Sequence, residues 1–73
     1  MQVGGQSNVI DQLTVREIEV LERLASGLTD QEIAIDLYLS LNTIKWYNRQ
    51  IYSKLGVSSR TQAVARARDL HLL

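Results

Sequence analysis

The stretch NTIKWYNRQIYSKLG, residues 42–56, decides the fold, because its residues divide between two faces of a helix. At about 100° per residue, Ile44, Ile51 and Leu55 lie together on one side, with Asn48 among them. That side is the predicted core face. The opposite side carries a stripe of polar and aromatic residues: Asn42, Lys45, Trp46, Arg49 and Ser53. The only tryptophan is therefore expected to point away from the core, beside two cations and an amide.

A first helix is predicted upstream, over residues 15–26. Thr14 followed by Glu17 has the form of a capping box, and Gly27 supplies the left-handed residue that commonly follows a helix end. Apolar residues then recur at helical spacing in this segment: Ile18, Leu21, Leu24, Ala25 and Leu28.

A second, shorter helix is predicted over residues 30–37, and it leads almost directly into the third. Thr29 followed by Glu32 forms another capping box, and Ser40 is well placed to cap a third helix over residues 41–55. Two helices joined by a turn of three or four residues are typical of a helix-turn-helix.

A fourth helix is predicted over residues 60–70, opened by a third capping box of Ser59 and Gln62. The chain has no proline and no strand-like alternation, so the expected fold class is all-α, a four-helix helix-turn-helix domain over residues 13–73. Residues 1–12 carry two glycines and no useful periodicity, and we expect them to be a flexible lead-in or linker.

Composition excludes several classes of function. Seventy-three residues leave little room for an enclosed active site, and 45% apolar content is that of an ordinary globular domain. There is no cysteine, and the single histidine, His71, lies near the end, so we expect no metal, no cofactor and no enzymatic activity. No apolar run approaches the roughly 18 residues that cross a bilayer, which predicts a cytoplasmic protein without a membrane partner.

Charge is unevenly distributed although the net charge is zero. Residues 1–42 carry two arginines against seven acids, a balance of −5, whereas residues 43–73 carry six cations against one acid, a balance of +5. Such asymmetry indicates a nucleic-acid or other anionic partner for one half of the chain. A bipolar surface that merely aids solubility is the alternative.

The polar stripe on the third helix has the composition that reads a DNA major groove. Lys45 and Arg49 can donate to guanine, Asn42 can pair with adenine, and the Trp46 indole can pack on a thymine methyl. Helix starts add unpaired amides that bind phosphate, with hydroxyls at Thr29 and Thr43 and a cation at Arg60 placed near them; their capping role alone is the alternative. The cations could equally be ordinary solvated residues, and Trp46 could anchor a protein interface.

The segments LTVREIEVL, GLTDQEIA, TIK, IYSKLGV and SRTQAVARAR occur in the order and spacing of a known family. Over residues 13–73 the chain resembles the LuxR-type (GerE-type) helix-turn-helix domain, and its sequence is most similar to the C-terminal domains of MalT-like regulators. The resemblance implies sequence-specific binding of double-stranded DNA by the C-terminal domain of a bacterial transcription regulator, with the third helix in the major groove. It also implies a homodimer on inverted half-sites, formed through the fourth helix.

Carried over by position, the resemblance assigns base contacts to the stripe and phosphate contacts to residues near the helix ends. The base-contacting positions that match the family are Lys45, Trp46 and Arg49, and Asn42 joins this set from the stripe derived above. The phosphate-contacting set is Thr29, Thr43, Lys54 and Arg60.

Two positions depart from the family pattern. Tyr47 stands where many members have a histidine, and Asn48 stands where an aliphatic residue is usual. An unpaired buried amide would cost roughly 1–3 kcal/mol. We therefore expect Asn48 to find a hydrogen-bond partner or to lie at the edge of the core.

Two other functions compete with this one. A helical protein-interaction module would use Trp46 as its anchor for a partner domain or RNA polymerase. A domain like region 4 of a sigma factor would share the helix-turn-helix and bind promoter DNA together with polymerase.

Overall fold

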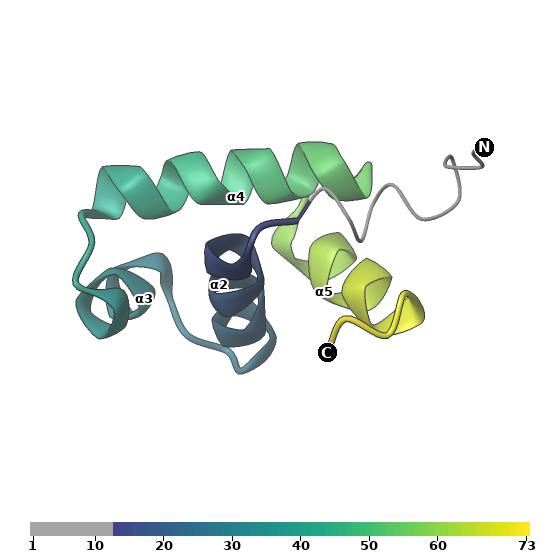
Figure 1. Ribbon diagram of the computed structural model, residues 1–73, viewed down its shortest axis with the longest axis horizontal. Helices are drawn as coiled ribbons and strands as arrows, with labels where there is room; N and C mark the ends of the chain where they lie inside the picture. The colour runs from purple at the N-terminus through teal and green to yellow at the C-terminus, as the bar shows by residue number, and fades with distance from the viewer. Residues whose placement is uncertain (1–12) are drawn as a thin grey trace.

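The computed structural model describes residues 13–73, which form four α-helices and no strand. With the labels of Figure 1, the helices are α2 (Val15–Ala25), α3 (Asp30–Leu37), α4 (Leu41–Leu55) and α5 (Arg60–Asp69). The all-α prediction is confirmed, although α2 and α5 each end one residue earlier than expected. The predicted lead-in, residues 1–12, lies outside the described residues.

The longest helix, α4, packs against the other three. In Figure 1 it runs along one side of the molecule, with α3, α2 and α5 side by side beneath it. The middle helix, α2, packs against both α3 and α5, whereas α3 and α5 meet only where the Arg60 side chain approaches Asp30, among the residues that the structure describes. Since α4 covers the other three on one side only, its opposite side faces solvent along its length.

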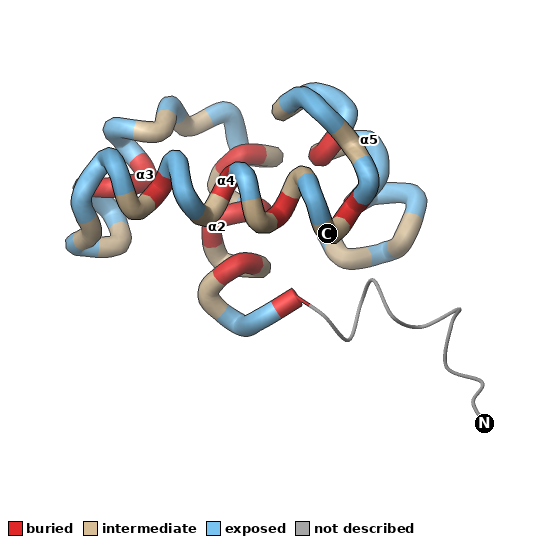
Figure 2. Tube along the Cα trace, turned by 90° about the horizontal axis from the view of Figure 1, so that it is seen from above, coloured by how far each residue is buried: buried red, intermediate tan, exposed pale blue. Residues whose placement is uncertain are grey.

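The core is built where the four helices meet, and Figure 2 shows its buried residues recurring along α2 and α4. Ile44, Ile51 and Leu55 are buried as the helical spacing of α4 predicts. In α2 the inward face is rotated slightly from the prediction, because Val20 is fully buried while Ile18 is only partly buried. The expected stripe includes Ile18, Leu21, Leu24 and Ala25, whereas the buried residues of α2 are Glu17, Val20, Leu21 and Leu24.

Each helix begins with a hydroxyl that accepts a backbone N–H. Thr14 and Thr29 form the two predicted capping boxes in full, with both reciprocal hydrogen bonds present. The third predicted box is only half correct. The backbone N–H of Gln62 donates to Ser59 Oγ at 3.2 Å, which is one half of the box. The Gln62 side-chain oxygen accepts from Ser58 N and not from the backbone N–H of Ser59, so the other half is missing.

Each helix ends in the same way, with a left-handed residue followed by an apolar one. The left-handed residues are Gly27, Tyr38, Gly56 and His71. In every case the next amide donates to the carbonyl five residues earlier, as in Leu28 N to Arg23 O and Leu39 N to Ala34 O, which is the Schellman motif. The four apolar residues that donate these bonds also pack against the core: Leu28, Leu39, Val57 and Leu72. The sequence indicates the two glycine ends, while Tyr38 and His71 adopt the same conformation without glycine.

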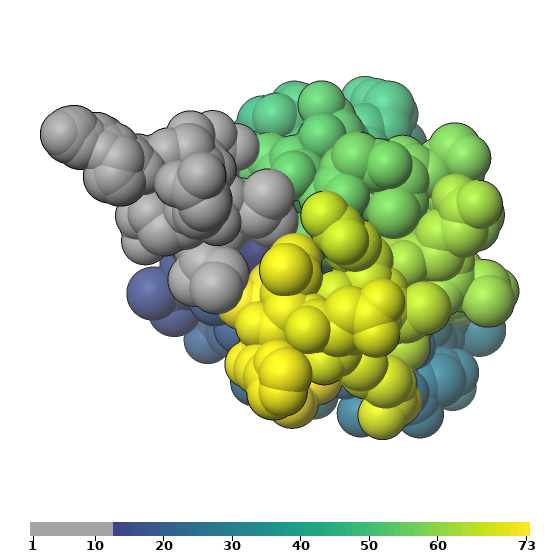
Figure 3. Space-filling view, turned by 90° about the vertical axis from the view of Figure 1, so that its right-hand side faces the viewer, coloured from purple at the N-terminus to yellow at the C-terminus, as the bar shows by residue number. Residues whose placement is uncertain are grey.

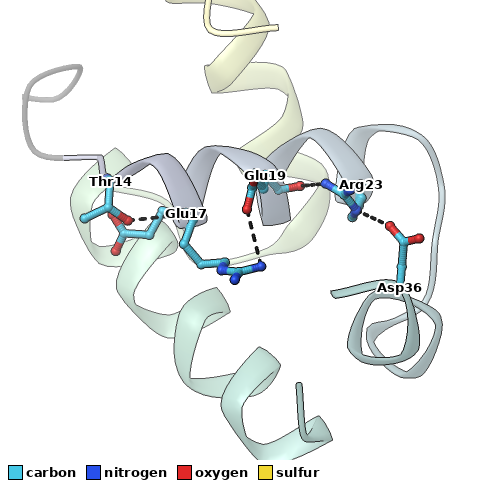
Figure 4. A network of polar contacts seen from close by, with 6 residues as sticks. Thr14, Glu17, Glu19, Arg23 and Asp36 are labelled. Carbon is cyan, nitrogen blue, oxygen red and sulfur yellow. Dashed lines mark hydrogen bonds and ion pairs between the residues drawn. The ribbon is translucent and has the colours of Figure 1, made fainter. Parts of the chain in front are cut away.

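Side-chain contacts lock α2 to α3. Arg23 of α2 pairs with Asp36 of α3 and donates from Nη1 to Glu19 O at 2.9 Å, as Figure 4 shows. The hydrogen bond that Arg23 donates to the Asp36 carboxylate raises the pKa of Arg23 above its usual value. No helix in the described part of the chain is long and apolar enough to span a bilayer.

Candidate nucleic-acid interface

The predicted base-reading residues lie along the uncovered side of α4. All five members of the stripe are exposed: Asn42, Lys45, Trp46, Arg49 and Ser53. Trp46 remains 47% exposed although it is the largest side chain on the helix. The structure therefore brings together the four predicted base contacts on one accessible face.

The ring of Trp46 contacts the ring of its neighbour, Tyr47. The ring centroids of Trp46 and Tyr47 lie 5.0 Å apart with an interplanar angle of 66°, an edge-on arrangement that favours both rings. Tyr47 itself is half-buried and packs against the core. The tyrosine thus limits the orientations available to the indole on the exposed face.

Local hydrogen bonds hold the start of α4. Ser40 Oγ accepts from Thr43 N at 3.1 Å, and the two hydroxyls lie 2.8 Å apart. Thr43 is the third residue of the helix and is half-buried. Its hydroxyl faces the first turn, where the N-terminal amides of α4 have no partner within the helix.

The start of α3 has a similar arrangement. Thr29 is exposed, its hydroxyl accepts from Glu32 N at 3.1 Å, and its own amide donates to Glu32 Oε1 at 2.8 Å. A hydroxyl that accepts from an amide still has its own hydrogen to donate. The Thr29 hydroxyl can therefore cap the helix and contact an anion at the same time.

Arg60, the first residue of α5, reaches across to the segment before α3. Its Nη2 atom donates to Leu28 O and lies 3.6 Å from Asp30 Oδ1. The Arg60 side chain is 40% exposed, so part of the guanidinium remains open to solvent. The loop before α3 and the start of α5 are thereby joined at one place.

Asn48 finds the partner that its buried position requires. Its Nδ2 atom donates to Asp30 Oδ1 at 2.9 Å, and the residue is only 8% exposed. The expectation of a hydrogen bond is confirmed, but Asn48 Oδ1 is buried with no partner among the residues that the structure describes. The side-chain nitrogen of Asn48 therefore has a hydrogen-bond partner, whereas the side-chain oxygen has none among the described residues.

Tyr52 lies beside the same group of charges. Burial raises the pKa of its hydroxyl, the nearby Arg60 lowers it, and the nearby Asp30 raises it. Asp30, which the sequence shows only as one acid among seven, is therefore at the centre of a cluster with Asn48, Tyr52 and Arg60. Charge counting places it in the acidic half of the chain and cannot detect this position.

Lys54, the remaining predicted phosphate contact, pairs with an acid of α2. Its Nζ atom lies 2.8 and 2.9 Å from the two carboxylate oxygens of Glu17, at the start of α2. Its side chain is 27% exposed, whereas that of Glu17 is 3% exposed. Lys54 therefore has a structural partner whatever else it contacts.

The face formed by α5 differs from the α4 face. Figure 3 shows α5 and the C-terminal residues forming one rounded surface below the C-terminal half of α4. The exposed residues of α5 are polar, charged or small: Thr61, Gln62, Ala65, Arg66, Arg68 and Asp69.

Among residues 13–73 there is no enclosed pocket, and no three histidine or acidic side chains are grouped as metal ligands would be.

Comparison with known proteins places this arrangement in a family. Residues 11–67 match the family described as bacterial regulatory proteins, luxR family. The chain is 43% identical over 63 residues to the transcriptional regulatory protein LiaR of Bacillus subtilis, covering 86% of this chain and 30% of LiaR. It is 42% identical over 79 residues to the probable transcriptional regulatory protein NarL of Mycobacterium tuberculosis, covering 97% of this chain and 37% of NarL.

A larger regulator and a solved structure are also similar. The HTH-type transcriptional regulator AlkS of Alcanivorax borkumensis is 37% identical over 67 residues, which are 92% of this chain and 8% of AlkS. The response regulator ChrA of a heme-sensing two-component system superposes with a TM-score of 0.82 at 44% identity, over 84% of this chain and 30% of ChrA. Since regulators of such different length match similarly well, the likeness to the MalT-like group stays a prediction.

The named relatives are transcriptional regulators, which are not enzymes, and this chain spans between 8% and 37% of the length of each. It has their helix-turn-helix, with α3 and α4 as the two helices of the motif. The chain belongs to the luxR family of bacterial regulatory proteins.

Proposed function

We propose that this domain binds double-stranded DNA in a sequence-specific way, with α4 lying in the major groove. The observation that carries the proposal is the exposed stripe of Asn42, Lys45, Trp46 and Arg49 on the second helix of a helix-turn-helix. A major groove about 12 Å wide admits one helix, and these side chains carry the donors, acceptors and apolar surface that base edges require.

Within the stripe each residue has a distinct role. Lys45 and Arg49 donate to guanine O6 and N7, Asn42 pairs with an adenine, and the Trp46 indole packs against a thymine methyl. The edge-on contact with Tyr47 supports this role for Trp46, since a ring that is already ordered loses less entropy on binding.

Phosphate contacts position the helix on the duplex. We assign them to the hydroxyls of Thr29 and Thr43 and to the guanidinium of Arg60, which lie at the starts of three helices where the dipole favours an anion. Lys54 contributes less in this proposal, because its ammonium must be shared with Glu17 before it reaches a phosphate.

The domain serves as the output domain of a bacterial transcription regulator in the cytoplasm. It acts as a homodimer on inverted half-sites, and the small and charged surface of α5 is its dimer contact. Contact with RNA polymerase is a further role open to such a domain, whereas catalysis has no support in the described residues. A single domain is expected to bind weakly. In a dimer, binding of the first domain raises the effective concentration of the second domain at its half-site, so two linked domains bind more tightly than one.

The test uses the single tryptophan as its probe. Duplex DNA is titrated into the 73-residue chain while Trp46 fluorescence is followed at two salt concentrations, with a covalently linked dimer as a parallel sample. Each phosphate contact lowers log K by about 0.9 per unit of log salt concentration, so a steep weakening with salt supports the proposal. A signal that changes little with salt favours a protein interface at Trp46, and no binding by either sample at low salt overturns the proposal.

A further inference from the structure

Asp30 is an acid placed among the groups to which we assign DNA contact. It is the first residue of α3, it follows Thr29 directly, and its Oδ1 atom lies 3.6 Å from Arg60 Nη2. Glu32, whose carboxylate accepts the Thr29 amide at 2.8 Å, is a second acid beside these contacts, and Asp30 is the acid that pairs with Arg60. A carboxylate in that place opposes the binding of a phosphate, so it needs a physical explanation.

The position of Asp30 is set from inside the protein. Asn48, on the core face of α4, donates from Nδ2 to the same Oδ1 atom at 2.9 Å. Asn48 stands among Ile44, Ile51 and Leu55, and Asp30 is the only side chain with which it makes a hydrogen bond in the described residues. One carboxylate oxygen is thus shared between a buried amide and an arginine.

The pair of charges is nevertheless accessible. The side chains of Asp30 and Arg60 are 32% and 40% exposed, and Arg60 also donates to Leu28 O. A guanidinium has five N–H donors in a planar fork, and the Leu28 carbonyl and Asp30 Oδ1 both face its Nη2 atom. A phosphate that approaches Arg60 therefore competes with Asp30 for the same cation.

We propose that Asp30 is an electrostatic brake on DNA binding, which holds Arg60 and lowers affinity for duplexes of any sequence. The inference rests on the proposed function, because it takes Arg60 as a phosphate contact. Asn48 is the positioning residue that keeps the carboxylate toward Arg60. Since phosphates carry no sequence information, the brake weakens non-specific binding and leaves discrimination to the base-reading stripe.

The first experiment compares two variants that lose one negative charge each. Asp30→Asn removes the brake, whereas Glu22→Gln removes an exposed charge on α2 that takes no part in the cluster. Binding of a fluorescein-labelled random duplex is measured by anisotropy over a series of salt concentrations. Exposed ion pairs contribute modestly, so Asp30→Asn is expected to tighten binding by roughly twofold to fivefold and Glu22→Gln by much less.

A double-mutant cycle separates the brake from simple repulsion. In an Arg60→Gln background, Asp30→Asn is expected to give no more gain than Glu22→Gln does, because the cation that the brake holds is gone. An equal gain in both backgrounds means that Asp30 repels DNA directly, which overturns the inference. Asp30→Ser serves as a second variant if thermal unfolding shows that Asp30→Asn is not folded.

The outcomes also distinguish this inference from the proposed function. If the unmodified chain binds duplex with steep salt dependence but Asp30→Asn and Glu22→Gln behave alike, the brake is wrong and DNA binding stands. If the unmodified chain and its linked dimer bind no duplex at low salt, both proposals are overturned.

Discussion

Lys54 Nζ contacts both carboxylate oxygens of Glu17, at 2.8 and 2.9 Å, and so ties the C-terminal end of α4 to the start of α2. Glu17 is 2% exposed and also accepts the Thr14 amide at 2.8 Å, so a single carboxylate completes a helix cap and an interhelical ion pair.

Removing the cation alone is expected to destabilise the domain strongly. Lys54→Ala leaves the Glu17 carboxylate buried without its partner, and we expect the free energy of unfolding to fall by about 2–4 kcal/mol. Urea unfolding followed by circular dichroism measures the change. The matched control is Arg16→Ala, which breaks the exposed ion pair between Arg16 and Glu19 and should cost no more than about 0.5 kcal/mol. Equal losses of stability for the two variants would show that the buried pair contributes no more than the exposed pair.

Tyr38 is expected to be a site where glycine stabilises the protein. Its φ is 58°, it is 95% exposed, and it adopts a conformation that costs a non-glycine residue about 1–2 kcal/mol. Tyr38→Gly relieves that strain but gives the unfolded chain more freedom, so a net gain of about 0.5–1 kcal/mol is expected. Tyr38→Ala, which removes the ring but keeps the strain, is the control. A gain of the same size with alanine would mean that the ring and not the backbone is responsible.

Gly56 offers the reverse test of the same physics. Its φ is 71°, and a Cβ added there meets no atom within 4 Å. Gly56→Ala is therefore expected to cost about 1–2 kcal/mol for backbone reasons alone, as measured by urea unfolding. An unchanged stability would contradict the role given to the left-handed residue at the end of α4.

Asn48→Leu is expected to leave the domain as stable as before or to stabilise it by up to about 1 kcal/mol. The substitution removes a buried oxygen without a partner and places an apolar side chain among Ile44, Ile51 and Leu55. Asp30 loses a hydrogen bond, but its side chain is 32% exposed and water can replace the bond. The midpoint of thermal unfolding checks this, and a fall in stability above about 1 kcal/mol would show that the amide is essential to packing.

The stability of the domain above pH 10 should depend on Tyr52. Burial raises the pKa of its hydroxyl in the folded state above the value of 10.0 for an unperturbed tyrosine. The neutral form is therefore favoured by folding, and its contribution is complete below pH 10 and is lost as pH rises from 10 through the folded pKa. Tyr52→Phe should lose less stability over that range than the unmodified chain. If the stability of the two proteins falls in parallel as pH rises, Tyr52 makes no such contribution.

Base contacts and phosphate contacts should respond differently to alanine. Once an operator has been selected from a random duplex library, Lys45→Ala and Arg49→Ala are each expected to weaken binding to it by about 1–3 kcal/mol with a smaller effect on random DNA. Arg60→Ala should weaken binding to both alike and reduce the salt slope by about 1. If all three variants lose equally on operator and random duplex, the division of roles is wrong.

The sequence by itself determined the four helices, their starts and the two faces of α4. Caps at Thr14, Thr29 and Ser40 join residues three apart, so the chain forms them without help from distant segments. The spacing of Ile44, Ile51 and Leu55 likewise makes one side of α4 apolar, and this leaves Trp46 and Lys45 outside.

Only the tertiary structure decided the contacts that cross the chain. The pairs of Glu17 with Lys54 and of Asp30 with Asn48 join residues 37 and 18 positions apart, and no local pattern distinguishes those side chains from others of the same type. Tyr38 and His71 take a left-handed conformation because Leu39 and Leu72 behind them are held by the core. Packing gains made by residues far apart in the chain outweigh the local backbone preference, and these exist only once the helices have docked.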